Sequence, residues 1–249
     1  MGHHGCVVTD PIRIVPLRPA PGLVPAVSPK LTYRGGPLLS AVEVFTAFWG
    51  AEWQGADAQL MAQVNDFFTY IVTSNLMDQL GEYSIPAVAI GHGSLTGTTT
   101  ITDTQPTNPV TDAQIQRLIQ SGITNATLPA TTPNSLYFVY LPPGVDVDLG
   151  GQMSCSAFCG YHDSIGGNVY YAVMPYPGCS GCIGGLSTLD ALTSTSSHEL
   201  CEAITDPVPG QGWYDDSNGE IGDICAWQTR KLDQWIVQLE WSNQSGACI

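Results

Sequence analysis

The chain has 249 residues, of which 43% are hydrophobic and 12% are charged, and its formal net charge is −15. This length corresponds to one domain or two small ones, with enough apolar residues to bury a sizeable core. Seven basic residues stand against 22 acidic ones. This balance argues against binding to nucleic acid or to an anionic membrane surface, because both need lysine and arginine.

The composition also indicates where the protein acts. Only two lysines occur, and the chain is acidic and rich in Gly, Pro and Thr, which is typical of a protein outside the cell. No stretch approaches the ~20 apolar residues of a membrane span. The opening residues MGHHGCVVTD lack the basic and apolar regions of a signal peptide. We leave His3 and His4 out of the search for a site.

The first 34 residues hold six of the 18 prolines and are expected to form an extended arm. We expect one domain over 35–249. Within it, alternating or short apolar runs predict strands at 41–49, 86–93, 135–144, 168–174 and 234–242. Helical spacing and capping residues predict helices at 56–73, 112–121 and 188–205, followed by a turn-rich loop over 210–227. This order predicts an α/β domain with a mixed, mainly central sheet and packed helices.

Cysteines are concentrated in the C-terminal part of the chain. The eight are Cys6, Cys155, Cys159, Cys179, Cys182, Cys201, Cys225 and Cys248. They fit either a disulfide framework in an oxidising compartment or a four-thiolate zinc site made from the pairs in CSAFC and CSGC. The acidic, lysine-poor context favours disulfides that stabilise the C-terminal half.

The segment STSSHELCEAITDP, residues 194–207, carries the strongest chemical signal. His198 and Glu202 are four residues apart, so a helix places them on one face, where both could bind one zinc ion. Glu199 follows the histidine directly. In zinc peptidases with a His-Glu-x-x-His helix, the glutamate at this place is the general base. Here a glutamate replaces the second histidine, and carboxylates are accepted zinc ligands.

The same residue pattern can also occur by chance on a solvent-exposed helix face. The helix has no other charged residue between Asp190 and Asp206, and its neighbours are apolar. Burial of one histidine and two glutamates without a partner is costly, and a metal ion is a natural partner. A catalytic zinc has three protein ligands and one open position. Candidates for the third ligand are Glu220, Asp223, Asp206 and His162, although Asp206 is expected to cap or turn the chain before Pro207.

Several segments together resemble the Exordium-like, phosphate-induced family of plant cell-wall proteins, and especially its microbial relatives. The likeness covers roughly residues 33–228. It rests on YRGGPLLSAVEVFTAFWGAEW, LYFVYLPPG, SAFCGYHDS, SHELCEAITDP and EIGDIC.

This resemblance implies an extracellular location and site positions at His162, Glu220 and Cys225. With it, the expected zinc ligands become His198, Glu202 and Glu220. Glu199 is then the base, His162 a further catalytic residue and Asp223 the reserve ligand.

These residues lead to the hypothesis of a secreted zinc metallopeptidase with a metalloprotease-like core, acting on a peptide or protein substrate, including one associated with a cell wall. One alternative is a non-catalytic extracellular cell-wall or signalling protein with a structural metal or none. Another is a hydrolase of a different substrate class.

Three finer expectations depend on the peptidase hypothesis. The strand at 168–174 would be an edge strand that binds substrate by β-addition. Trp213 and Tyr214 would line the cleft or simply pack under a loop. A Cys201–Cys225 disulfide would hold Glu220 near the metal.

Overall fold

A computed structural model describes residues 14–18 and 28–249 of the chain. Most of the predicted N-terminal arm lies outside these residues. Its described parts include two short strands, β1 (Ile14–Pro16) and β2 (Thr32–Tyr33), which pair with strands of the main body.

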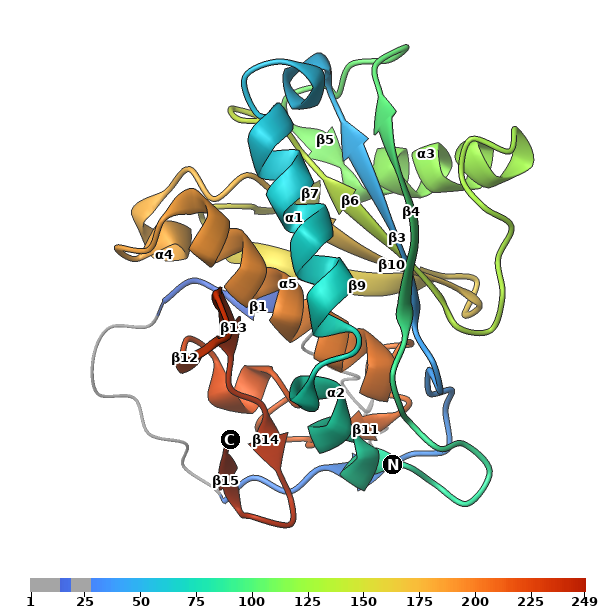
Figure 1. Ribbon diagram of the computed structural model, residues 1–249, viewed down its shortest axis with the longest axis vertical. Helices are drawn as coiled ribbons and strands as arrows, with labels where there is room; N and C mark the ends of the chain where they lie inside the picture. Colours follow the sequence, from blue (N-terminus) through green and yellow to red (C-terminus); the bar gives the residue numbers. More distant parts are fainter. Residues whose placement is uncertain (1–13, 19–27) are drawn as a thin grey trace, which may run out of the picture.

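The core of the fold is a six-stranded mixed sheet in the order β1-β9-β10-β6-β3-β4 (Figure 1). Its members are β3 (Glu43–Trp49), β4 (Ser94–Ile101), β6 (Ser135–Tyr140), β9 (Phe158–Ile165) and β10 (Val169–Met174), with β1 at one edge. Strands β4, β3, β6 and β10 run parallel, whereas β9 is antiparallel to both β10 and β1. The predicted mixed α/β class is therefore confirmed.

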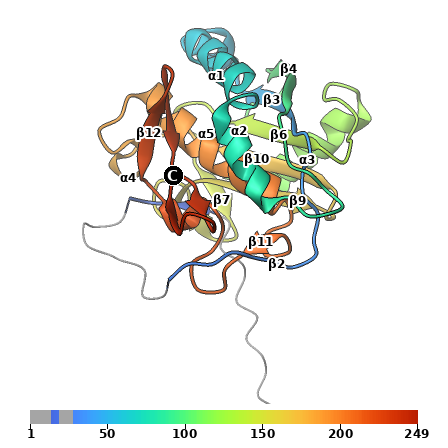
Figure 2. The same ribbon diagram turned by 60° about the horizontal axis from the view of Figure 1, so that its bottom comes forward.

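Helices cover both faces of this sheet (Figures 1 and 2). On one face, α1 (Ala58–Ile71) and α5 (Thr188–Thr205) pack against apolar side chains such as Phe48, Phe138 and Met174. On the other face, α3 (Asp112–Thr124) packs against a second apolar cluster that includes Tyr137 and Val139. The alternation of side chains along each strand supplies both clusters.

Smaller elements complete the fold. The short helices are α2 (Asn75–Leu80) and α4 (Ser180–Ile183), with 3-10 turns η1 (Ala51–Gln54), η2 (Gly81–Tyr83) and η3 (Asp223–Cys225). The remaining strands are β5 (Val110–Thr111), β7 (Val147–Leu149), β8 (Gln152–Met153), β11 (Trp213–Tyr214), β12 (Thr229–Leu232), β13 (Trp235–Gln238), β14 (Trp241–Ser242) and β15 (Ala247–Cys248).

Helix α5 has the bounds predicted from the sequence, 188–205. The Ser187 side chain accepts a hydrogen bond from the Asp190 backbone and caps its start. Every residue from Ala191 to Thr205 is buried, because the helix is enclosed by the sheet, α1 and β13. The charged residues on this helix are therefore removed from water.

Three strand predictions are wrong. The segment 86–93 forms a turn and irregular chain, and the strand begins at Ser94 instead. The strand predicted at 234–242 breaks into β13 and β14. The third, β10, was expected to be an edge strand, but it lies between β6 and β9. Both of its hydrogen-bonding edges are used, so it cannot receive a substrate by β-addition.

The structure contains three disulfides, which link Cys155 to Cys179, Cys159 to Cys182 and Cys225 to Cys248. They confirm the disulfide framework and consume the thiols of the alternative four-thiolate zinc site. The expected Cys201–Cys225 bridge is wrong, since Cys201 is a buried free thiol. Such bridges fit an oxidising or extracellular environment. Within the described part of the chain, no helix has the length and apolar character to cross a bilayer.

This disulfide map predicts the labelling of Cys201. Under non-reducing conditions, iodoacetamide should modify its peptide only after denaturation, because Cys201 is completely buried in the fold. The Cys155, Cys159, Cys179, Cys182, Cys225 and Cys248 peptides should become labelled only after reduction. Peptide mapping by mass spectrometry checks both statements, and recovery of a disulfide-linked Cys201 peptide would contradict them.

Candidate metal centre

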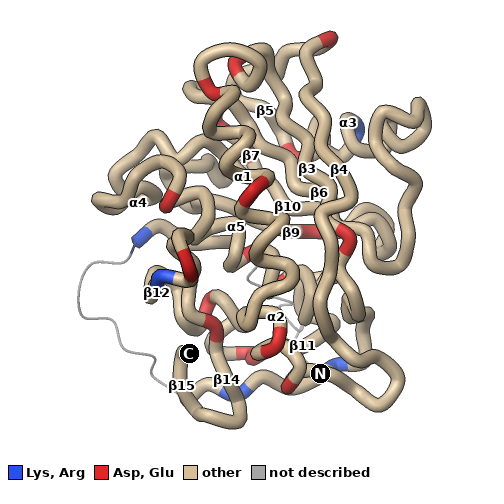
Figure 3. The backbone as a smooth tube through the Cα atoms, viewed as in Figure 1, with Lys and Arg blue, Asp and Glu red and all other residues tan. Residues whose placement is uncertain are grey.

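Five buried acidic and histidine side chains meet at the inner face of helix α5. His198, Glu199 and Glu202 come from α5, His162 comes from the antiparallel strand β9, and Glu220 comes from the loop before η3. Each has 0% solvent exposure. Asp223, at the start of η3, joins them from a partly exposed position. In Figure 3 acidic segments gather between the labels α5, α2 and β14.

The first group consists of His198, Glu202 and Asp223, whose ligand atoms all lie within 4.8 Å of one another. The i, i+4 spacing brings His198 Nε2 to 2.9 Å from Glu202 Oε1. The two atoms are close but not aligned for a hydrogen bond, since both ring nitrogens of His198 lack a hydrogen-bonding partner. The backbone N–H of Asp223 donates to Glu202 Oε1 at 3.0 Å, which ties the loop to the helix.

The second group consists of His162, Glu199 and Glu202, whose ligand atoms also lie within 4.8 Å of one another. His162 Nδ1 lies 3.1 Å from Glu199 Oε2 and 3.5 Å from Glu202 Oε2. Its other ring nitrogen, Nε2, is 3.1 Å from the backbone carbonyl of Asp206. A carbonyl only accepts hydrogen bonds, so Nε2 carries the proton. Nδ1 therefore faces two carboxylate oxygens with either a second proton or a lone pair.

Glycine residues let the loop approach the helix. A Cβ atom on Gly222 would lie 2.8 Å from the His198 ring and 2.9 Å from Glu202 Oε1. Gly219 has a φ of 87°, a left-handed conformation that glycine adopts most readily. The side chain of Gln238 on β13 donates to the Gly222 carbonyl at 2.9 Å, which holds the loop in this position.

The cluster contains many buried polar atoms that lack a hydrogen-bonding partner among the described residues. They are both ring nitrogens of His198, Glu199 Oε1, Glu202 Oε2, both carboxylate oxygens of Glu220 and Asp223 Oδ1. Each such atom costs about 1–3 kcal/mol, and more when it is charged. A divalent cation would satisfy several of them at once, so these residues fit a metal.

The buried titratable groups of the cluster act strongly on one another. Burial lowers the pKa of His198, but Glu202, Glu199 and Asp223 together raise it well above its ordinary value. Burial would raise the pKa of Glu202, whereas His198 and His162 lower it to about 2. Burial, followed by the charge of Glu202, raises the pKa of Asp223 well above its usual range. Without a cation, carboxyl groups of this cluster must therefore hold protons to coexist.

The structure brings Asp223, rather than Glu220, into the group with His198 and Glu202. Glu220 Oε1 instead lies 3.5 Å from His162 Nε2, on the side of the ring that faces the Asp206 carbonyl. This placement favours Asp223 as the third ligand and Glu220 as a neighbour of His162. Both residues were candidates from the sequence, with Glu220 expected as the ligand and Asp223 as the reserve.

Asp206 has a different role. Its carboxylate accepts backbone hydrogen bonds from Gly210, Gln211 and Gly212. It therefore closes the turn after α5, as expected, and is not available as a ligand.

Sequence reasoning missed the fully buried Glu240, whose pKa is raised well above its usual value by burial. The sequence signal for this buried residue was a single glutamate in the mainly apolar segment WIVQLEW.

Trp213 and Tyr214 pack under the loop rather than line a cleft at the cluster. They form β11 with the N-terminal segment. The Trp213 indole N–H donates to the Tyr83 carbonyl at 2.7 Å, and its ring contacts those of Tyr33 and Tyr83.

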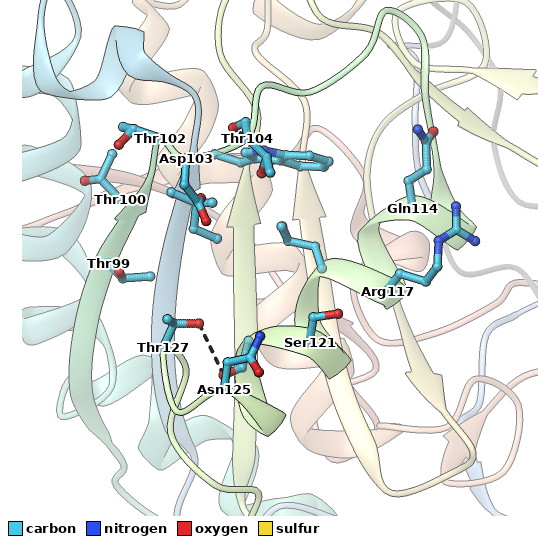
Figure 4. Close-up of a pocket in the computed structure, with 14 residues that line it drawn as sticks. Thr99, Thr100, Thr102, Asp103, Thr104, Gln114, Arg117, Ser121, Asn125 and Thr127 are labelled. Carbon is cyan, nitrogen blue, oxygen red and sulfur yellow. Dashed lines mark hydrogen bonds between the residues drawn. The ribbon is translucent and has the colours of Figure 1, made fainter.

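A pocket of about 610 Å³ lies elsewhere, between β4 and α3 (Figure 4). Thr99, Asp103 and Arg117 are among its lining residues, and none of the cluster residues is. Because α3 and α5 cover opposite faces of the sheet, a molecule in this pocket would be separated from the cluster by the sheet.

Comparisons with known proteins find no match for this chain among protein families, curated proteins or solved structures. The functional interpretation therefore rests on the site itself.

The close approach of Gly222 gives a test of the metal centre. Gly222→Ala should weaken zinc binding roughly 10–100-fold, the usual cost of disturbing the residues that orient metal ligands, because the new methyl group displaces His198 or Glu202. Isothermal titration calorimetry measures the affinity. Gly81→Ala is the matched control, since its Cβ would meet nothing closer than 4.0 Å. Equal zinc affinity of the two variants would contradict the assignment.

Proposed function

We propose that this protein is a secreted, zinc-dependent hydrolase of peptide bonds, whose metal centre includes the first and last residues of the sequence HELCE, His198 and Glu202. The observation that carries the proposal is the group of His198, Glu202 and Asp223, in which a buried histidine has no hydrogen-bonding partner for either ring nitrogen. The three disulfides are consistent with secretion.

The spacing of the donor atoms suits zinc. Two atoms that each bind a tetrahedral zinc ion at about 2.1 Å lie about 3.4 Å apart. The distance of 3.5 Å between His162 and Glu202 is close to this value, whereas the 2.9 Å between His198 and Glu202 is shorter, so these two side chains would separate slightly to bind one ion. One histidine and two carboxylates also leave a fourth position for water or substrate, as in catalytic zinc sites.

A bound zinc ion would supply Lewis acidity, which polarises a carbonyl group and makes a coordinated water more acidic. The chain itself would supply the proton acceptor, and Glu199 is the candidate because it follows His198 in the helix. His162 lies 3.1 Å from Glu199 Oε2 and would orient that carboxylate. The choice of peptides as the substrate class, rather than esters or other amides, follows only from the likeness of this helix to zinc-peptidase helices.

A structural metal is the second candidate, and complete burial of the cluster favours it. His162, His198, Glu199, Glu202 and Glu220 have no solvent exposure, and only Asp223 is partly exposed. Structural zinc sites are closed, whereas catalytic sites keep an open position. In this role the metal would join α5, β9 and the loop around Gly222.

The hydrolase proposal predicts the behaviour of Glu199→Gln. The wild-type protein should hold zinc and cleave casein or a peptide library, and Glu199→Gln should lower kcat by a factor of about 10² or more, the usual contribution of a general base. Glu52→Gln, on an exposed turn, is the control and should match the wild type. Cleavage by Glu199→Gln at the wild-type rate would exclude its role as base. Absence of cleavage by zinc-loaded wild type would favour the structural metal.

Chelation tests the metal separately from activity. Removal of zinc with EDTA should lower the unfolding free energy by about 2.7 kcal/mol relative to protein kept at a free zinc concentration 100 times the dissociation constant. The reason is that only the folded cluster brings the ligands together. Urea unfolding with and without zinc measures this difference. An unchanged midpoint, together with zinc-free protein after dialysis against zinc, would contradict a metal in this cluster.

A further inference from the structure

We propose that the cluster holds two divalent cations, bridged by the carboxylate of Glu202. This inference rests on the proposed metal centre and deepens it. It assigns an outer cation to His198, Glu202 and Asp223, and an inner cation to His162, Glu199 and Glu202. These are the two groups whose ligand atoms converge within 4.8 Å, and Glu202 is the residue that they share.

The two oxygens of Glu202 point toward different histidines. Oε1 lies 2.9 Å from His198 Nε2, and Oε2 lies 3.5 Å from His162 Nδ1. The two histidines therefore stand at opposite ends of one carboxylate. A carboxylate in this position can give one oxygen to each of two cations, which in two-metal sites are about 3.5–4 Å apart.

The inner group has the hydrogen-bonding pattern of a metal-binding histidine. His162 Nε2–H donates to the Asp206 carbonyl at 3.1 Å, which leaves Nδ1 to face Glu199 Oε2 and Glu202 Oε2. Metal-binding histidines usually donate their second ring N–H to a backbone carbonyl or a carboxylate. Here the acceptor is the Asp206 carbonyl, and Glu220 Oε1 lies 3.5 Å from the same Nε2 without a hydrogen bond.

Both ring nitrogens of His162 have hydrogen-bonding partners, Glu199 Oε2 and the Asp206 carbonyl, but those of the outer histidine do not. Neither nitrogen of the buried His198 ring has a hydrogen-bonding partner, and Asp223 Oδ1 is also unpartnered. His162 and His198 approach different oxygens of Glu202, and the ligand atoms converge as two separate groups, so each group has its own histidine. A single ion in either group leaves a histidine and a carboxylate of the other group facing each other.

Charge balance also favours two ions. Glu199, Glu202, Glu220 and Asp223 contribute four negative charges when ionised, and the two histidines are neutral when they bind metal. Two divalent cations neutralise these charges, whereas one leaves the remaining carboxyl groups either protonated or charged in a buried region. No lysine or arginine makes an ion pair with these carboxylates among the described residues.

A second cation changes the role of Glu199. With one cation in the outer group, Glu199 is the candidate base. With two cations, its Oε2 binds the inner ion. Both arrangements predict loss of activity in Glu199→Gln, but only the second predicts loss of a metal ion.

The experiment is a measurement of zinc stoichiometry in the full chain. His3 and His4 are changed to Gln in every sample, so that the N-terminal histidines bind no zinc. After equilibrium dialysis against zinc, elemental analysis should find two zinc ions per chain. Glu199→Gln and His162→Gln should each retain one, Asp223→Asn should retain one, and Glu202→Gln should retain fewer than one. Glu52→Gln, on an exposed turn outside both groups, is the control, and it should retain two.

The outcomes separate the two proposals. One zinc ion per wild-type chain overturns the two-cation inference and leaves the proposed metal centre intact, and no zinc overturns both. Two ions that persist in both Glu199→Gln and His162→Gln overturn the assigned inner group. Anomalous diffraction from zinc-loaded wild-type crystals, which needs no variant to fold, should show two peaks about 3.5–4 Å apart, and a single peak in the cluster overturns the inference.

Discussion

The burial of helix α5 is the constraint on which the rest of the structure depends. The helix is covered by β9 and β10 on one side and by α1 and β13 on the others, so each polar group on it must find a partner within the protein. Its hydroxyl side chains do so. Ser197 donates to the Ser194 carbonyl, Thr205 donates to the Cys201 carbonyl, and Ser196 bonds the Tyr140 hydroxyl. His198, Glu199 and Glu202 cannot be satisfied in the same way, and they attract the surrounding histidine and carboxylates into one cluster.

The loop opposite helix α5, around Gly222 and Asp223, has little regular secondary structure and is fixed by a disulfide and by hydrogen bonds. Cys225 is fixed to Cys248, and Gln238 joins two parts of the site, because its backbone N–H donates to Ser197 Oγ and its side chain donates to the Gly222 carbonyl. These bonds lie beside the cluster rather than within it. They position Asp223 and Glu220 before any cation arrives, which lowers the ordering cost of binding.

The sequence predicted the parts of this arrangement that depend on local periodicity. Helix α5 was identified by its residue pattern and by Pro207 beyond its end, and the i, i+4 relation of His198 and Glu202 follows directly from the helix. Strand β9 was not identified, because the cysteine and glycine in AFCGYHDS interrupt the alternation of a strand. Its place beside α5 depends on long-range pairing with β10. The choice between Asp223 and Glu220 likewise depends on a 3-10 turn, and the disulfide partners depend on tertiary proximity.

Access to the cluster follows from the same packing. Five of its members are fully buried, and Asp223 is partly exposed as a residue although its Oδ1 is buried. Asp206 holds the turn after α5 through three backbone hydrogen bonds from residues 210–212, while its carbonyl orients His162. One residue therefore fixes both the end of the helix and the ring of the inner histidine.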